Sequence, residues 1–121
     1  MYESEAQLLR EAMEAVVDDG LRSVSVVGSD FFDVKYIRDD VVPAYDSDAF
    51  DAFFEVLRAT DAETETGDAG LPFGDRRGVV LRYEDVVVML FPLAEALLAA
   101  TYDATGGESV FDRVERRLSE S

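Results

Sequence analysis

An apolar run in the C-terminal third constrains the fold more than any other part of the sequence. Residues 86–91, VVVMLF, are apolar without alternation, which is typical of a strand covered on both faces. The next residues, PLAEALLAATY, favour a helix by propensity, with Pro92 at its first position. Alternatively, a turn at 93–95 would return residues 96–102 as an antiparallel strand. The choice decides whether this third is a helical pair or a three-stranded sheet closed by one helix.

The N-terminal segment has the spacing of an amphipathic helix. Four apolar residues recur at i, i+4, i+7 and i+8, namely Leu9, Met13, Val16 and Val17. This spacing predicts a helix over residues 5–19 with these side chains in the core. Ser4 and Gln7 match a capping box, and Gly20 stands where a left-handed residue would end the helix.

Residues 22–38 have the alternation of a β-hairpin, with strands over 22–27 and 31–38. In the second strand the alternation gives two sets of side chains: Phe32, Val34 and Tyr36 on a buried face, and Asp33 and Lys35 on the other. The charged residues 38–40 at its end are a candidate functional cluster. We expect instead a solvated strand end with a weak ion pair.

A second helix is predicted after Pro43, with Ser47 as its cap. Aromatic and apolar residues recur there at helical spacing, namely Phe50, Phe53, Phe54 and Leu57. Residues 59–78 are polar and contain glycines, so we expect a mobile acidic loop that is either a flexible connection or a partner-binding loop. The nearby acids lack the ligand spacing and the glycine of a calcium loop, so no metal site is expected.

The C-terminal part predicts a second hairpin, residues 79–83 and 86–91, and a final helix over 108–119. That helix is expected to place Val110, Phe111, Val114 and Leu118 inward and Arg113, Arg116 and Arg117 outward. A chain of 121 residues is expected to form one domain, residues 1–121. Without a secretory signal or a run near the ~20 apolar residues that span a bilayer, we expect a cytoplasmic protein that does not enter a membrane.

The charge balance is strongly acidic, with 27 acidic and 11 basic residues and a net charge of −16. The acids are spread along the chain, lysine and isoleucine each occur once, and cysteine, histidine, tryptophan and asparagine are absent. This composition resembles that of proteins from extreme halophiles. A binder of a basic partner or a nucleic-acid mimic is the alternative, but it more often has a concentrated acidic block. Binding to nucleic acid is not expected, because no basic patch is visible.

The residue types also argue against catalysis. Without histidine or cysteine, the chain lacks the commonest general base and the soft metal ligand, and a serine nucleophile has no histidine to activate it. Carboxylate chemistry remains open, but the spacing of the acids singles out no pair. We therefore expect no enzyme activity and name no catalytic, cofactor-binding or metal-binding residue.

The order helix, two strands, helix, three strands, helix resembles the roadblock/LC7 domain, a profilin-like α+β fold with one antiparallel sheet of about five strands. The C-terminal likeness lies in VVVMLFP, LAE, ALLAATYD, ATGG and ESVFDRVERRL. The stretch GLRSVSVVGSDFFDVKY resembles the first hairpin of that family, although Asp30 or Phe31 replaces the usual turn glycine. This resemblance implies that residues 96–102 are a strand. DVKYIRDDV followed by FPL also resembles small uncharacterised haloarchaeal proteins, and PAYDSDAFDAFF resembles the halobacterial output domain of signalling proteins.

The roadblock resemblance implies a domain without a catalytic centre that forms homodimers or heterodimers, often through edge strands and a helix. Many such domains regulate or scaffold Ras-like GTPases. We therefore expect a homodimeric interaction or regulatory module with a small GTPase or signalling protein as its partner. Two alternatives stay open. A small-molecule sensor or signalling output domain requires an enclosed apolar pocket of a few hundred Å³, and a carboxylate- or cation-dependent enzyme requires acids that converge in one cleft.

The acidic composition predicts that stability depends on salt. At about 1 M salt the Debye length falls to about 3 Å, so repulsion between surface carboxylates is screened while apolar burial remains. The melting temperature, followed by circular dichroism, should rise steeply from dilute buffer to molar KCl. A melting temperature that does not change with KCl would contradict halophilic adaptation.

Overall fold

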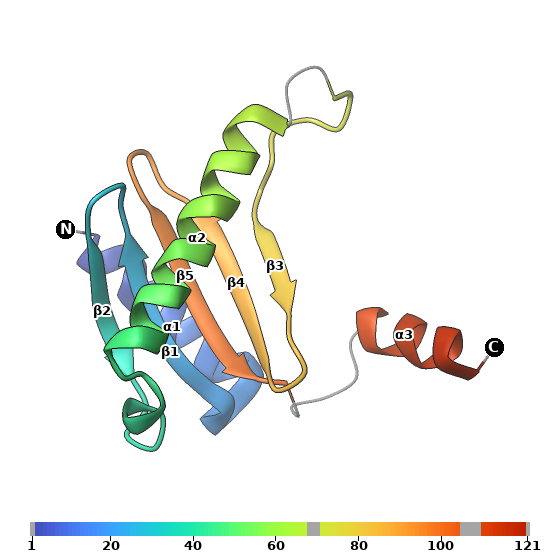
Figure 1. Cartoon of the computed structure of the whole chain (residues 1–121), viewed down its shortest axis with the longest axis horizontal. Helices are drawn as coiled ribbons and strands as arrows, with labels where there is room; N and C mark the ends of the chain where they lie inside the picture. The colour runs from blue at the N-terminus through green and yellow to red at the C-terminus, as the bar shows by residue number, and fades with distance from the viewer. Residues whose placement is uncertain (1, 68–70, 105–109, 121) are drawn as a thin grey trace.

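The computed structural model describes residues 2–67, 71–104 and 110–120. The regular elements follow the predicted order: α1 (Glu3–Val17), β1 (Leu21–Val27), β2 (Phe32–Ile37), α2 (Ser47–Gly67), β3 (Val79–Arg82), β4 (Val86–Pro92), β5 (Leu97–Asp103) and α3 (Val110–Glu120). Short 3-10 turns occupy Asp18–Gly20 and Val42–Ala44. The fold is α+β, with one five-stranded antiparallel sheet in the order β2-β1-β5-β4-β3, so the predicted fold class is confirmed (Figure 1).

In the stretch after Pro92, residues 97–103 form the strand β5, as the roadblock resemblance implied for residues 96–102. Ala100 of β5 lies opposite Val24 of β1 on one side and Met89 of β4 on the other. The turn before β5 is closed by a hydrogen bond of 2.8 Å from the Leu93 amide to the Ala96 carbonyl. Hydrogen bonding along both sides of β5 and burial on both faces outweigh the helical propensity of its leucines and alanines.

The sheet lies between two helices, with a separate apolar core on each side. α1 packs over β1, β5 and β2, and its buried side chains Ala6 and Met13 meet a cluster formed by Leu21, Val24, Val26, Leu98 and Ala100. On the other side, Leu57 of α2 is fully buried in a cluster with Val27, Val88, Leu90, Leu97 and Ala99. β5 contributes alternate residues to both cores.

Three details predicted for α1 are wrong. The helix begins at Glu3, after Tyr2 in the left-handed region, and it has no side-chain cap. It ends at Val17, and the positive φ of 54° belongs to Asp18 rather than Gly20. The exposed fraction of Val16 is 78%, because the sheet-facing stripe runs through Ala6, Leu9, Met13 and Val17.

The prediction that three alternate residues of β2 share a face is also wrong. Val34 pairs with Ser25, whereas Tyr36 pairs with Val24, so Lys35 is an extra residue in the ladder. Such a β-bulge shifts the alternation by one position. Phe32 and Val34 consequently face α2, while Tyr36 packs into the core on the α1 side.

The predicted mobile loop over residues 59–78 is wrong in its first part, because α2 continues to Gly67. Within this extension the Thr60 hydroxyl donates a hydrogen bond of 2.8 Å to the Val56 carbonyl. Its residues are polar, but several have good helix propensity, so the helix continues beyond the part that covers the sheet. Residues 68–70 lie outside the described part, and residues 71–78 contain no helix or strand. Their mobility stays a prediction.

The prediction that the apolar side chains of the last helix point inward is wrong for those that are described. The exposed fractions of Phe111 and Val114 are 53% each, and that of Leu118 is 69%. The side chain of Val110 and residues 108–109 lie outside the described part. Figure 1 shows α3 beyond the β3 edge of the sheet. The sequence pattern correctly predicts an amphipathic helix, but the pattern does not say what covers its apolar face.

Candidate interaction surface

The two edges of the sheet differ in charge. β2, at one edge, carries Asp33 and Lys35, and charged side chains on an edge strand disfavour pairing with another chain. β3, at the other edge, has the sequence VVLR without an acidic residue. In the described part of the chain no strand pairs with its outer side. β3 is therefore the edge at which a further strand can extend the sheet.

The residues around β3 carry about as many basic as acidic side chains. Between residues 71 and 83 there are three arginines and one aspartate. α3 contains three arginines and three acids. Because the whole chain carries a net charge of −16, two copies that approach through this side experience less repulsion than through any acidic face.

Large apolar side chains are exposed next to β3. Their exposed fractions are 49% for Leu71, 81% for Phe73, 61% for Val80 and 49% for Tyr83. Exposed apolar side chains of this size are candidates for contact with a partner. We call residues 71–83 together with α3 the β3 surface.

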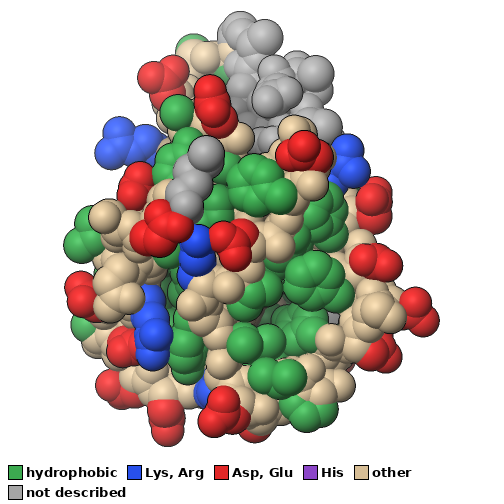
Figure 2. Space-filling view, turned by 90° about the vertical axis from the view of Figure 1, so that its left-hand side faces the viewer, with side chains coloured by type: hydrophobic (Ala, Val, Ile, Leu, Met, Phe, Trp, Pro, Cys, Tyr) green, Lys and Arg blue, Asp and Glu red, His purple; other side chains and the backbone are tan. Residues whose placement is uncertain are grey.

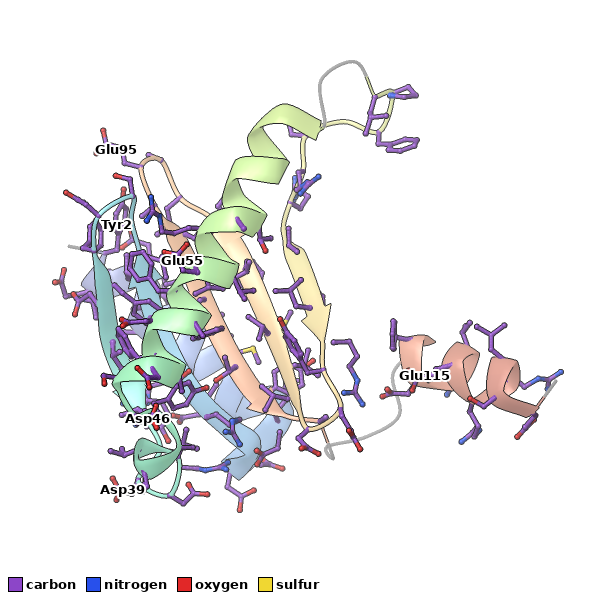
Figure 3. All side chains as sticks on the ribbon, in the orientation of Figure 1. Tyr2, Asp39, Asp46, Glu55, Glu95 and Glu115 are labelled. Atoms are coloured by element: carbon purple, nitrogen blue, oxygen red, sulfur yellow. The ribbon has the colours of Figure 1, made fainter. Side chains whose placement is uncertain are left out.

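α3 meets the edge strand through its polar side. Asp112 Oδ1 accepts a hydrogen bond of 3.1 Å from Arg82 Nε, and the side chains are 21% and 19% exposed respectively. Asp112 lies about 160° around the helix from Val114. This ion pair therefore joins the side of α3 that is opposite Val114 to β3. Figure 3 shows α3, which carries the labelled Glu115, beyond the β3 edge of the sheet.

A second polar cluster lies where β1, β2 and β5 meet. Asp103 accepts hydrogen bonds from Arg38 Nη1 at 2.8 Å and from Arg22 Nη1 at 3.1 Å. Arg38 also donates to the Asp19 carbonyl at 2.8 Å and binds Asp40. Hydrogen bonds from Arg38 and Arg22 lower the pKa of Asp103, against the opposing effect of partial burial. We call Arg22, Arg38 and Asp103 the arginine clasp.

The arginine clasp is a structural tie rather than an open site. The oxygens of Asp103 accept hydrogen bonds from both arginines, which leaves little capacity for a ligand. The predicted weak, solvated ion pair at residues 38–40 is therefore only part of the arrangement. Sequence reasoning missed Asp103 because it lies 65 residues from Arg38, and only the pairing of β1 with both neighbours brings them together.

Three hollows in the described part of the chain are small or polar. One of about 30 Å³ lies below the start of α2, where Phe32 packs on Phe50 with ring centroids 4.5 Å apart. This volume suits about one water molecule. Figure 2 faces the β2 edge and shows apolar side chains gathered between the helices, with acidic side chains around them. Two further hollows measure about 70 and 180 Å³.

The 180 Å³ hollow lies between α1 and β2 and is lined by charged groups that pair with one another. Lys35 Nζ lies 2.6 Å from Asp33 and 3.2 Å from Glu3. Arg10 pairs with Glu14 at 2.7 Å and stands 4.0 Å from the centre of the Tyr36 ring. None of these three hollows is the enclosed apolar pocket that a small-molecule sensor requires.

Comparison with known proteins assigns the family. A family model described as a domain of unknown function, DUF7522, matches residues 7–119. This chain belongs to the DUF7522 family. The crystal structure of MglC from Myxococcus xanthus resembles it with a TM-score of 0.53 and 21% identity, over 93% of each chain. No curated protein matches the sequence significantly.

The likeness to MglC concerns the fold, and it supports the roadblock-like α+β architecture of this DUF7522 chain. Among its described residues, no group of three or more acidic side chains is arranged to hold a metal ion. None of the helices in residues 2–67, 71–104 and 110–120 combines the length and apolar character needed to cross a bilayer. Of the features described, the β3 surface is therefore the strongest candidate for binding a partner.

The arginine clasp makes a prediction about pH. Because the pKa of Asp103 is lower in the folded state, its contribution to stability is present above its unfolded pKa of about 3.9 and is lost as the pH falls through the folded value. Asp103→Asn should lower the free energy of unfolding by about 1–3 kcal/mol at pH 7, because two arginines lose a charged partner.

Urea unfolding in molar KCl measures this difference, with Asp51→Asn on the exposed side of α2 as the matched control. The difference in free energy of unfolding between Asp103→Asn and the unsubstituted chain should become smaller below about pH 4. The control should stay within about 0.5 kcal/mol of the unsubstituted chain at every pH. Equal stability of both variants at pH 7 would contradict a structural role for the clasp.

Proposed function

We propose that this chain is a non-catalytic dimerisation and protein-interaction module of a halophilic archaeon. The observation that carries the proposal is the open, non-acidic β3 edge beside exposed apolar side chains. Homodimers with two-fold symmetry bury the same patch on both copies, and an open edge strand offers unpaired N–H and C=O groups to its own copy. The roadblock-like fold supports a scaffold that acts through such surfaces.

Two β3 strands, one from each copy, can form this interface as an antiparallel pair. Val79 and Leu81 point toward α2, and Val80 and Arg82 point toward the α1 side. Pairing would hydrogen-bond the outer backbone groups and cover part of Val80. It would also place a side of each copy with balanced charge at the contact, where screening by molar salt removes most of the remaining repulsion.

The partner proposed beyond the second copy is a small GTPase or another signalling protein in the cytoplasm. This step rests on what the roadblock resemblance implies. A dimer that uses β3 leaves the acidic outer faces of α1 and α2 available to such a partner. Affinity capture from a halophile lysate at molar KCl, using the dimeric chain as bait, tests it. Recovery of no GTPase or signalling protein would contradict the partner assignment but not the dimer.

A pair of matched edge variants tests the dimer. Val80→Glu places a carboxylate on β3, and in a two-fold pair two such charges lie close together, so it should shift the mass from dimer to monomer. Val34→Glu makes the same change on the other edge strand, where the exposed fraction of Val34 is 38%, and should leave the dimer intact. Multi-angle light scattering in molar KCl gives both masses. A monomeric unsubstituted chain would overturn the proposal.

A further inference from the structure

We propose that α3 is exchanged between the two copies of the dimer, so that its apolar face covers the sheet of the other copy. The surface it covers is formed by Val80, Met89 and Phe91 on the α1 side of β3 and β4, which we call the β3–β4 face. The inference rests on the proposed dimer and adds a second, helical contact to the strand pairing.

The β3–β4 face is the part of the sheet that α1 leaves open. α1 makes its main contacts with β1, β5 and β2, and β4 lies at the border of the core that α1 covers. Val80 lies opposite Met89, and the side chains of such a pair share a face. Val80 is 61% exposed, while Met89 and Phe91 are partly buried at the border of the α1-side core. An apolar strip thus continues from the core to the β3 edge.

One face of α3 is apolar, like the β3–β4 face, but it does not point toward the sheet of its own chain. Phe111, Val114 and Leu118 all have more than half of their surface exposed. The ion pair between Arg82 and Asp112 joins the opposite side of the helix to β3. To cover its own β3–β4 face, α3 would have to rotate by about half a turn and break this pair.

The geometry of strand pairing directs α3 to the other copy. Two antiparallel β3 strands in one continuous sheet are related by a two-fold axis perpendicular to the sheet, so the α1 sides of both copies lie on the same side. Arg82 pairs with Val87, two positions along the ladder from the pair of Val80 and Met89. Its side chain therefore lies on the same face, the α1 side. α3 extends from Arg82 past the β3 edge (Figure 1), into the space above the β3–β4 face of the second copy.

Charge favours a second copy of this chain as the occupant. α3 carries equal numbers of acidic and basic residues, so it approaches a copy with a net charge of −16 without the repulsion that an acidic helix would meet. A basic partner would instead be drawn to the acidic outer face of α1. The neutral helix and the adjoining arginines are suited to self-association.

Cysteine cross-linking tests the exchange directly, because the chain contains no cysteine. Met89→Cys and Val114→Cys are made as separate chains with different mass tags, refolded together in molar KCl and oxidised. The expected product is a disulfide between the two different chains, seen by non-reducing mass spectrometry. Val16→Cys on the exposed side of α1 replaces Met89→Cys in the matched control, which should give no such product above background.

Light scattering on the same samples distinguishes the two proposals. A dimer without the mixed disulfide would overturn the exchange and leave the dimer, whereas a monomer would overturn both. A chain carrying both Met89→Cys and Val114→Cys that closes an internal disulfide as a monomer would show that α3 covers its own sheet, and would also overturn the exchange.

A charge substitution gives an independent readout. Val114→Asp should raise the dimer dissociation constant at least tenfold while the monomer stays folded, because Val114 is exposed in a single copy. Val16→Asp makes the same change at a residue that is 78% exposed on α1 and should leave the dissociation constant within about twofold. An unchanged dissociation constant for Val114→Asp would overturn the exchange.

Discussion

The pairing of β5 with a strand on each side holds the fold together. β1 belongs to the N-terminal hairpin and β4 to the C-terminal one, and only β5 joins them into one sheet. Leu98 and Ala100 enter the core below α1, while Leu97 and Ala99 enter the core below α2. The same pairing brings Asp103 to Arg22 and Arg38. A helix at this position would leave two separate hairpins, each too small to bury its apolar face.

Sequence patterns predicted the type and order of most elements because those elements have strong local signals. β5 is the exception, since its propensity favours a helix and only the family resemblance implied a strand. The features they missed depend on contacts between distant residues. The extra residue Lys35 becomes visible only in the register between β1 and β2, and it moves Tyr36 to the opposite core. The polar, glycine-bearing sequence after Arg58 predicts a loop, but several of its residues have good helix propensity, and α2 continues to Gly67. The exposed face of α3 was missed because helical spacing identifies an apolar face without identifying its cover.

The β3 surface was harder to predict from the sequence than the fold, because it too depends on how distant parts of the chain are arranged. β3 is recognised as an open edge only when the strand order places it there, and its low acidity matters only by contrast with β2. The contacts that place α3 beside it include the ion pair between Arg82 and Asp112. The sequence directed attention to interaction rather than catalysis as the hypothesis to test, but it did not rank the surfaces.

The acidic faces and the β3 surface affect the association of two copies in opposite ways. Spread carboxylates keep most faces of two copies apart, and the arginine clasp provides one partly buried ion-pair cluster that salt screens less than exposed pairs. The side with balanced charge is also the side with an open strand edge and exposed apolar groups. We propose that charge thereby restricts association to the place where backbone pairing is available.

Amide hydrogen exchange of β3 in molar KCl tests the central claim most directly. If β3 is paired with a second copy, amides within Val79–Arg82 that face outward from the sheet should be protected, and the protection should decrease on dilution as the dimer dissociates. Outward amides of β2 should exchange fast at every concentration and serve as the internal reference. Equally fast exchange at both edges, independent of protein concentration, would contradict the account.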